Sequence, residues 1–469
     1  MNGVIMKSFN RRDFLKTAAI SGIGLTMAPS FAKADEKIKF QRSKPNGKVN
    51  IAFIGVGLRG RDHIDNIAKR KDVEITAICD LDKNALEETQ KILRDHSRKE
   101  AATYTGDEYA FMKLLERDDV DGVIIATPWL WHTRMAVAAM KAGKFPGIEV
   151  SAANTIDECW DLVNTSEETG IPCMLLENVC FAREAMAVLK MIREGVWGEL
   201  VHATCGYRHD LREVKFNDGK QPYGGGVEFG DKGFSEAKWR TKHSLLRNGD
   251  IYPTHGIGPV AEWFDINRGN RFVSLTSTAT KSIGLHNYIV NHPKGGEDHP
   301  NAKLEWKLGD IITSVIKTAK DETLIVTHDT NLPRPYSWGF TMHSEKGVWD
   351  GQFEGKRFYL EGKSKPHTWT EGDEYDNLMK SYDHPLWWKE EEEAEGAGHG
   401  GIDYFTDKAF VDSVKNMVQP PIDVYDAAAW SAITPLSEAS IASNSSPQFF
   451  PDFTRGRWMT NKRIFGLTD

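Results

Sequence analysis

The feature that most constrains the fold of this chain is a glycine pattern directly after a short apolar run. Residues 50–54 (NIAFI) have the β-branched and aromatic character of a buried strand, and they lead straight into the G-x-G-x-x-G pattern of Gly55, Gly57 and Gly60. In a strand–turn–helix unit the first glycine makes the tight turn, the second lets a pyrophosphate approach the backbone, and the third lets helix and strand pack closely. A helix over residues 61–70 would offer its positive N-terminus to the phosphates. The pattern therefore predicts a dinucleotide-binding α/β domain.

The residues after this pattern continue the same architecture. A second strand over residues 73–79 ends in Asp80, twenty residues after Gly60, where an acid accepts ribose hydroxyls and repels a 2′-phosphate. This favours NAD over NADP. Strand and helix patterns then alternate, which predicts a doubly wound parallel sheet within a Rossmann domain over residues 48–178. The predicted helices cover residues 83–95, 106–116, 133–142 and 156–169, and the predicted strands cover residues 122–126, 147–150 and 173–176.

Polar and aromatic residues follow the predicted strands at the edge where ligands collect in such sheets. The strand over residues 122–126 runs into residues 129–132 (WLWH), and the strand over residues 173–176 delivers Glu177 and Asn178 to the same edge. We expect residues 129–132 to contact the cofactor. The alternative is that the tryptophans only pack and that the histidine has a core or capping role.

The N-terminus of the chain resembles an export address. Arg11 and Arg12 precede a weakly apolar run over residues 17–29, and residues 32–34 (AKA) supply the small side chains that a signal peptidase reads. We interpret residues 1–34 as a twin-arginine signal peptide and residues 35–47 as a linker, which predicts a periplasmic protein. An amphipathic N-terminal helix is the alternative. No later apolar run reaches the ~20 residues that span a bilayer, so we expect a soluble mature chain.

Composition excludes several partners. A net charge of −8 with 27% charged residues argues against a nucleic-acid surface, so the expected partner is a small, neutral molecule. The histidines at 292 and 299 lack a regular ligand spacing, and no metal site is predicted. A homo-oligomer is left open. The odd number of cysteines and their spacing favour buried free thiols over disulfides, in a chain that folds in the reducing cytosol before transport. These residues are Cys79, Cys159, Cys173, Cys180 and Cys205.

The order of these pieces, with H-x-x-x-A-x-x-A-x-x-A-G-K over residues 132–144, resembles the glucose-fructose oxidoreductase and inositol dehydrogenase superfamily. The resemblance implies a second domain, residues 179–469, with an α+β fold and an open, mostly antiparallel sheet. Members usually continue with Glu-Lys-Pro, in which the lysine assists hydride transfer from an alcohol. Here the letters are Glu149-Val150-Ser151. The missing lysine argues against an ordinary sugar dehydrogenase.

Three further stretches are similar to glycoside hydrolase family 109, whose members are NAD-dependent α-N-acetylgalactosaminidases. They are Glu149-Val150, residues 129–132, and Trp239-Arg240 followed by LRNGDIYPTHGIGPVAEW over residues 246–263. The likeness covers nearly the whole mature chain. Together with the glycine pattern it implies cofactor contacts at Gly55, Gly57, Leu58, Arg59, Gly60, Asp80, Trp129, Leu130, Trp131, His132, Glu149, Val150 and Asn178. It implies sugar contacts at Tyr207, Arg240, Tyr252, Pro253, Thr254, His255 and Tyr336.

The resemblance also implies a mechanism without the two flanking carboxylates of ordinary glycosidases. Hydride passes from C3 of the sugar to NAD, the C2 proton becomes acidic and is removed, and the group at C1 leaves by elimination. Water then adds, and the hydride returns, so there is no net redox change. Because the coenzyme is regenerated in every turnover, one tightly bound NAD loaded in the cytosol would serve an exported glycosidase.

Two catalytic residues follow from this mechanism. Thr254 is expected to cap a helix, and a neutral His255 beside it would take the C3 hydroxyl proton. Tyr252 would act on the C2 proton or the leaving oxygen, provided that a cation such as Arg240 favours its phenolate. Tyr207 and Arg240 are cast as sugar binders through directed hydrogen bonds. The alternative is that Tyr252 and His255 only cap a helix and pack an interdomain seam.

Other interpretations stay open at this stage. The chain could be an NAD(P)-dependent sugar oxidoreductase of the same superfamily, or an exported sugar-binding protein in which NAD is structural. The glycine-rich residues 221–233 form either a mobile loop near the site or a plain surface loop. The acidic residues 389–401 are interpreted as a solvated turn, and His399 within them has no assigned role.

Overall fold

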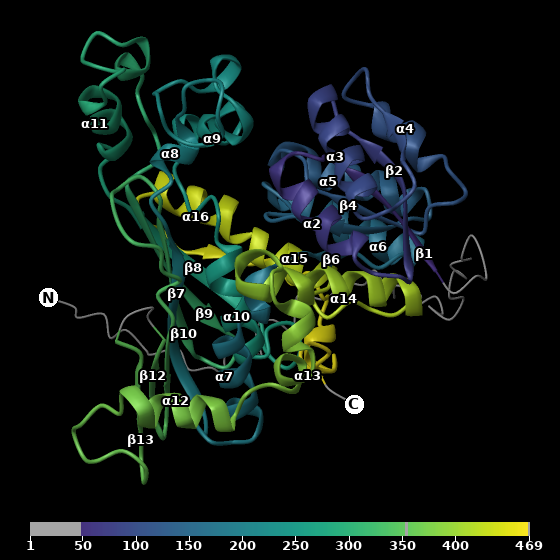
Figure 1. Cartoon of the computed structure of the whole chain (residues 1–469). Helices are drawn as coiled ribbons and strands as arrows, with labels where there is room; N and C mark the ends of the chain where they lie inside the picture. The colour runs from purple at the N-terminus through teal and green to yellow at the C-terminus, as the bar shows by residue number, and fades with distance from the viewer. Residues whose placement is uncertain (1–47, 352–354, 468–469) are drawn as a thin grey trace, which may run out of the picture. The chain divides into compact units, whose positions relative to one another are not determined.

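The computed structural model describes residues 48–351 and 355–467, which belong to one compact unit. The predicted signal peptide and linker lie outside the described residues. The elements can be followed by their labels in Figure 1. Among the residues described, no helix is both long enough and apolar enough to cross a membrane.

The first half of the described chain forms the predicted parallel sheet. Its strand order is β3-β2-β1-β4-β5-β6, the order of a doubly wound dinucleotide-binding fold. β1 is buried along its whole length, as expected for a central strand of a parallel sheet. The strands are β1 (Val49–Ile54), β2 (Val73–Cys79), β3 (Ala102–Tyr104), β4 (Gly122–Ile125), β5 (Phe145–Ile148) and β6 (Met174–Leu175). The helices are α2 (Leu58–Ala68), α3 (Lys83–Asp95), α4 (Ala110–Leu115), α5 (Trp129–Lys141) and α6 (Ile156–Thr169).

Three of the predicted helices can be compared directly with the structure. Two predictions are confirmed, and one has the wrong starting residue. The predictions for α3 and α6 are confirmed, because Asp82 and Thr155 accept backbone N–H groups at their first turns. The prediction of a helix from residue 133 is wrong in its start, since α5 already begins at Trp129 after Pro128. The WLWH residues therefore form the first turn of a helix beyond β4 rather than a strand end.

The second half of the chain forms an eight-stranded sheet, which confirms the predicted fold class. Its order is β13-β12-β11-β7-β10-β9-β8-β14, and every neighbouring pair is antiparallel except β7 and β10. The strands are β7 (Leu200–Arg208), β8 (Phe272–Ala279), β9 (Ile311–Thr318), β10 (Thr323–Asp329), β11 (Thr341–Ser344), β12 (Gly347–Asp350), β13 (Arg357–Leu360) and β14 (Gln448–Phe449).

Helices of the second half pack on both sheets. α14 (Ile402–Asn416) contacts α2, α15 (Val424–Ser431) contacts α6 and β6, and α16 (Ile433–Ala442) covers β8. The division of the chain at residue 178 stays a prediction, because these contacts join the two halves. The remaining helices of more than four residues are α7 (Arg183–Arg193), α9 (Arg240–Leu246), α10 (Thr254–Trp263), α11 (Gly284–Asn291), α12 (Gly372–Ser381) and α13 (Pro385–Ala394).

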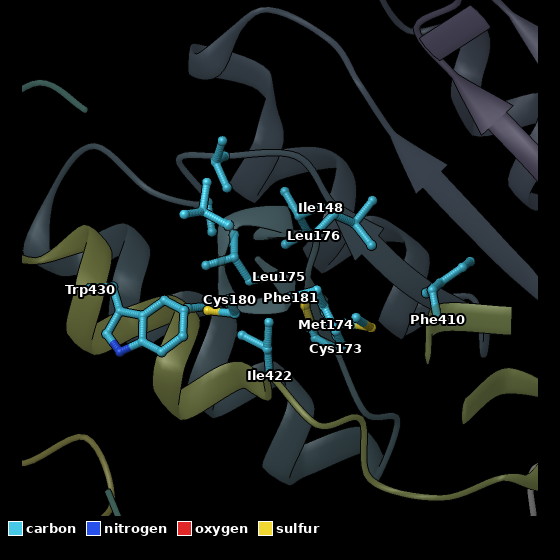
Figure 2. Close-up of a cluster of buried hydrophobic side chains, with 14 of the residues drawn as sticks. Ile148, Cys173, Met174, Leu175, Leu176, Cys180, Phe181, Phe410, Ile422 and Trp430 are labelled. Carbon is cyan, nitrogen blue, oxygen red and sulfur yellow. The ribbon is translucent and has the colours of Figure 1, made fainter. Parts of the chain in front are cut away.

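A buried apolar cluster lies where β6 meets the C-terminal helices (Figure 2). Met174 and Leu175 of β6 share it with Cys180 of the short helix η1 (Asn178–Phe181), Phe410 of α14 and Trp430 of α15. This packing holds the segment that carries Glu177 and Asn178. All five cysteines of the sequence fall within the described residues and are buried and unpaired, which confirms that prediction.

Candidate functional site

A crevice of about 1290 Å³ opens beyond the carboxyl ends of the parallel strands and is lined by both halves of the chain. Most of the predicted site residues line it, and five do not. The lining residues are Gly55, Gly57, Leu58, Arg59, Asp80, Trp129, Trp131, His132, Glu149, Val150, Asn178, Tyr207, Arg240, Tyr252 and His255. The predicted residues outside the lining are Gly60, Leu130, Pro253, Thr254 and Tyr336. A single cavity thus brings the predicted cofactor and sugar contacts together.

The glycine turn has the geometry that a dinucleotide needs. Gly55 has φ +88°, and a Cβ there would lie 2.6 Å from the Ala126 carbonyl oxygen, while a Cβ on Gly60 would lie 2.2 Å from the Gly55 carbonyl oxygen. At Gly57, by contrast, a Cβ would meet no atom within 4 Å. α2 starts directly after Gly57 without a side-chain cap, so its first N–H groups are available to an anion.

Three other residues define the cofactor side of the crevice. Asp80 directly follows β2, and its Oδ2 accepts the Val56 backbone N–H at 2.8 Å. The Oδ1 atom of Asn178 is buried and has no hydrogen-bond partner within the described part of the chain. Because buried amide oxygens are rarely left unpaired, a ligand donor is expected there. The ring nitrogens of His132 lie 2.8 and 2.7 Å from backbone carbonyl oxygens, which ties this residue to the surrounding loops.

A chain of mostly buried charges borders the cofactor side of the crevice and joins α2 to α14. Arg59 contacts Glu149 at 2.6 Å and Asp403 at 2.7 Å. His63 lies 2.8 Å from Glu149 and 2.5 Å from Asp407. Burial alone would raise the pKa of Glu149, but Arg59 and His63 outweigh it and hold that pKa well below its usual value. Glu149 is therefore an anion inside the fold.

The buried histidine of this chain predicts a dependence of stability on pH. Burial by itself lowers the pKa of His63, but Asp407 outweighs it and the pKa rises from 6.5 to about 9. The protonated ring therefore stabilises the fold fully below about pH 6.5, and the contribution is lost as the pH rises through about 9. Urea titrations of wild type and His63→Gln should differ by about 3 kcal/mol in unfolding free energy at pH 6, with the gap closing by pH 10. A gap that stays constant over this range would contradict the assignment.

Another part of the crevice wall is aromatic and cationic. The Trp129 and Tyr252 rings stack with centroids 5.5 Å apart, and the Arg240 guanidinium lies 4.9 Å from the Tyr252 centroid. Burial nevertheless raises the pKa of Tyr252 well above its usual value, although Arg240 acts to lower it. The prediction that Arg240 favours the phenolate of Tyr252 is thus wrong. The loss of hydration on burial raises the pKa more than the Arg240 charge lowers it. Burial likewise raises the pKa of Tyr207 to about 12, so both tyrosines are hydrogen-bond donors.

His255 is held by a carboxylate that the sequence prediction left out of the site. Its Nδ1 lies 2.7 Å from Oε1 of Glu177, and Glu177 is completely buried. The same Oε1 accepts the Val179 backbone N–H at 3.1 Å, which marks it as an acceptor, so Nδ1 of His255 is the donor. Nε2 is then the ring nitrogen that can accept a proton from a ligand. The sequence feature that could have indicated a site role for Glu177 is its position directly before Asn178, at the end of a predicted strand.

The predicted capping role of Thr254 is wrong. α10 already begins at Thr254, Pro253 is its N-cap, and no side chain caps it. Thr254 thus lies inside the first turn and not at the capping position, and its Oγ1 is buried without a partner in the described structure. Gly256 brings this end of α10 close to β7, since a Cβ there would lie 2.6 Å from the Gly206 nitrogen.

Several lining residues had no predicted role, and His399, His209 and Tyr223 are among them. His399 lies in η5 (Gly398–Gly401), its Nδ1 is 2.8 Å from Asp403 Oδ2, and this hydrogen bond raises its pKa. His209 has its pKa lowered to about 4 by burial and by Arg240. Tyr223 comes from the glycine-rich residues 221–233, which places that loop at the crevice. His399 stands next to glycines in an acidic segment, where the sequence pattern indicated only a turn.

Tyr336 lies behind the crevice wall. Its ring centroid is 5.9 Å from that of Tyr207 and 4.5 Å from that of His209, and its hydroxyl accepts the Trp338 indole N–H at 2.6 Å. In this arrangement Tyr336 supports two lining residues. Its predicted sugar contact stays a prediction.

Comparisons with known proteins agree with the fold. Residues 49–176 match the oxidoreductase family with an NAD-binding Rossmann fold, and residues 181–460 match the C-terminal domain of glycosyl hydrolase 109. An α-N-acetylgalactosaminidase of Tannerella forsythia is 51% identical, with 97% of this chain and 99% of that protein covered. A glycosyl hydrolase family 109 protein of Parabacteroides distasonis is 49% identical over 97% and 99% of the two chains.

Solved structures of other proteins share the architecture. A levoglucosan dehydrogenase in complex with NADH and L-sorbose superposes with a TM-score of 0.62 at 18% identity, covering 87% of this chain and 100% of that one. A scyllo-inositol dehydrogenase of Lactobacillus casei gives a TM-score of 0.58 at 14% identity, covering 86% and 99%. At such low sequence identity these two structures support the fold and not the function. The full-length relatives and the match over residues 181–460 decide the family: the chain belongs to the glycosyl hydrolase 109 family.

Proposed function

We propose that this protein hydrolyses terminal α-N-acetylgalactosamine from glycans with the help of a tightly held NAD. The observation that carries the proposal is the single crevice that is lined by Gly57 of the glycine turn as well as by Tyr252 and His255, with His255 held by Glu177. The name of the Tannerella forsythia relative supports the sugar. Val150 stands where the related dehydrogenases carry lysine, which argues against a simple sugar oxidoreductase.

The residues present fit the dinucleotide. The open space at Gly57 and the uncapped start of α2 suit a pyrophosphate, Asp80 suits a ribose, and the unpaired Oδ1 of Asn178 suits an amide donor. When bound, NAD would supply a hydride acceptor for C3 of the sugar and would return the same hydride before product release.

The protein side chains then handle the protons. His255, with Nδ1–H held by Glu177, accepts the proton of the C3 hydroxyl at Nε2. Tyr252 is a neutral phenol, so it donates a hydrogen bond to the oxygen at C3 or to the leaving oxygen and does not act as a phenolate base. The C2 proton is therefore also assigned to Nε2 of His255, after that atom has passed the C3 proton on to solvent in the crevice. Arg240 and Tyr207 hold the sugar through directed hydrogen bonds.

His399 is the group best suited to protonate the leaving oxygen. It lines the crevice, and its hydrogen bond to Asp403 raises the pKa of the ring and so favours its protonated form. General acids of this kind typically contribute about 10²–10⁴-fold to a rate. Export through the twin-arginine pathway is part of the proposal, because a folded protein could then carry its NAD out of the cytosol and regenerate it in place.

One assay separates this proposal from its alternatives. The purified protein is incubated with p-nitrophenyl α-N-acetylgalactosaminide in D₂O without added coenzyme. We expect release of nitrophenol, no accumulation of reduced nicotinamide, and deuterium at C2 of the released sugar. A sugar oxidoreductase would accumulate NADH or need a second sugar, and a binding protein would release nothing. Hydrolysis without deuterium at C2 would reject the elimination mechanism.

A further inference from the structure

One carboxylate joins the cofactor side of the crevice to the loop that carries His399. Asp403, in the first turn of α14, is completely buried. Its Oδ1 accepts from Arg59 Nη2 at 3.0 Å and from Asn178 Nδ2 at 2.7 Å. Its Oδ2 accepts from Arg59 Nη1 at 2.7 Å and from His399 Nδ1 at 2.8 Å. Two predicted cofactor contacts and one residue of the sugar side thus share a single anion.

The loop before α14 has a backbone that lets it reach this carboxylate. His399, Gly400 and Gly401 have φ of +55°, +72° and +96°, a left-handed region that a histidine rarely occupies. A Cβ on Gly398 would lie 2.3 Å from Asp403 Oδ2, so only glycine lets the backbone pass so close to the carboxylate. Such backbone conformations cost free energy and persist only where many surrounding contacts hold them in place. They are often found at functional sites.

Four charged groups act on the His399 ring. Asp403 and Glu149 favour its protonated form, whereas Arg59 disfavours it. Asp62 of α2 lies near enough to interact with the ring as well. Among these groups in the described structure, Asp403 is the one that forms a hydrogen bond with the imidazole, so it also determines which ring nitrogen faces the ligand.

We propose that Asp403 is the positioning residue of His399: it binds the Nδ1–H group and thereby presents Nε2–H to the leaving oxygen of the substrate. The inference rests on the proposed function, in which His399 protonates that oxygen. It further implies that the cofactor contacts Arg59 and Asn178 and the acid are held in place by the same carboxylate.

α14 offers a matched control one turn further along. Asp407 accepts from His63 Nδ1 at 2.5 Å and from Asn66 Nδ2 at 3.2 Å, so it also ties α14 to α2 through a nearly buried carboxylate. Asp403→Asn and Asp407→Asn therefore remove the same charge from the same helix interface. Only the first change removes the carboxylate that holds His399.

The first measurement compares two leaving groups on the holoenzyme. For methyl α-N-acetylgalactosaminide, whose leaving group needs a proton, we expect Asp403→Asn to lower kcat by about 100-fold. For the p-nitrophenyl glycoside, whose leaving group departs without one, the loss should stay below about fivefold. Asp407→Asn should keep the wild-type ratio of the two rates. An unchanged ratio in Asp403→Asn would overturn the proposal.

The second measurement does not need turnover. In protein labelled with ¹³C-histidine, the His399 signal is assigned by its loss in His399→Gln and then titrated with pH. We expect its midpoint to fall by about one pH unit or more in Asp403→Asn and to stay in place in Asp407→Asn. A midpoint unchanged in Asp403→Asn would overturn the positioning role. If the wild-type protein is inactive but the His399 midpoint still falls in Asp403→Asn, the proposed function is rejected. Asp403 is then still supported as the residue that holds His399.

Discussion

Replacement of His255 by alanine is expected to leave NAD bound and to lower kcat by about 10³-fold, which corresponds to ~4 kcal/mol of transition-state stabilisation. The Nε2 atom of this residue is the proposed acceptor of the C3 hydroxyl proton, and the buried Glu177 fixes the ring through a 2.7 Å contact. Because the residue belongs to α10 and not to the glycine turn, cofactor content should not change. The measurements are kcat with the p-nitrophenyl glycoside and the absorbance of NAD released on denaturation.

Two further variants make this result specific. Glu177→Gln removes the charge behind the ring and should lower kcat by about tenfold or more while KM changes little. His202→Ala removes a histidine of β7 that bonds Thr323 and does not line the crevice, so it should retain wild-type activity. Wild-type kcat in His255→Ala would remove this residue from the mechanism, and a loss of NAD in the same variant would assign it to cofactor binding.

Replacement of Gly57 by alanine is expected to impair the protein by a different route, through weaker binding of NAD. The backbone of Gly57 has φ −66°, which alanine adopts easily, and the added Cβ would meet no protein atom within 4 Å. The methyl group would instead occupy the space that the pyrophosphate needs. We expect apo stability within about 1 kcal/mol of wild type and NAD affinity about 100-fold weaker, or ~2.7 kcal/mol. Calorimetric titration with NAD and a melting curve of the apo protein measure both.

Gly60→Ala is the contrasting variant. Its Cβ would lie 2.2 Å from the Gly55 carbonyl oxygen, so α2 and β1 would have to separate. That overpacking should cost about 3 kcal/mol of stability and lower the melting temperature before any effect on NAD can be measured. If Gly57→Ala binds NAD as tightly as wild type, the pyrophosphate does not approach this turn.

Much of the N-terminal half was predictable from sequence because its signals are local. The strand before Gly55, the acid at Asp80 and the caps of α3 and α6 each depend on residues close together in the chain. A glycine pattern specifies a turn by backbone geometry alone, whatever the rest of the protein does. The start of α5 was missed because residues 129–132 have the apolar character of a strand end, and Pro128 marked the boundary instead.

The sequence by itself determined the parallel sheet, the dinucleotide turn and a set of tyrosine, arginine and histidine residues that line the crevice, since short-range patterns and a family likeness encode them. Only the tertiary structure decided which carboxylates hold His255 and His399 and whether Tyr252 is ionised. Glu177 meets His255, and Asp403 meets Arg59, Asn178 and His399, through contacts between segments that are mostly far apart in the chain. Burial, which no local pattern reports, made Tyr252 a phenol in spite of Arg240. Charge and hydration at a buried site depend on the packing of the whole fold, and that packing is settled only when all elements are in place.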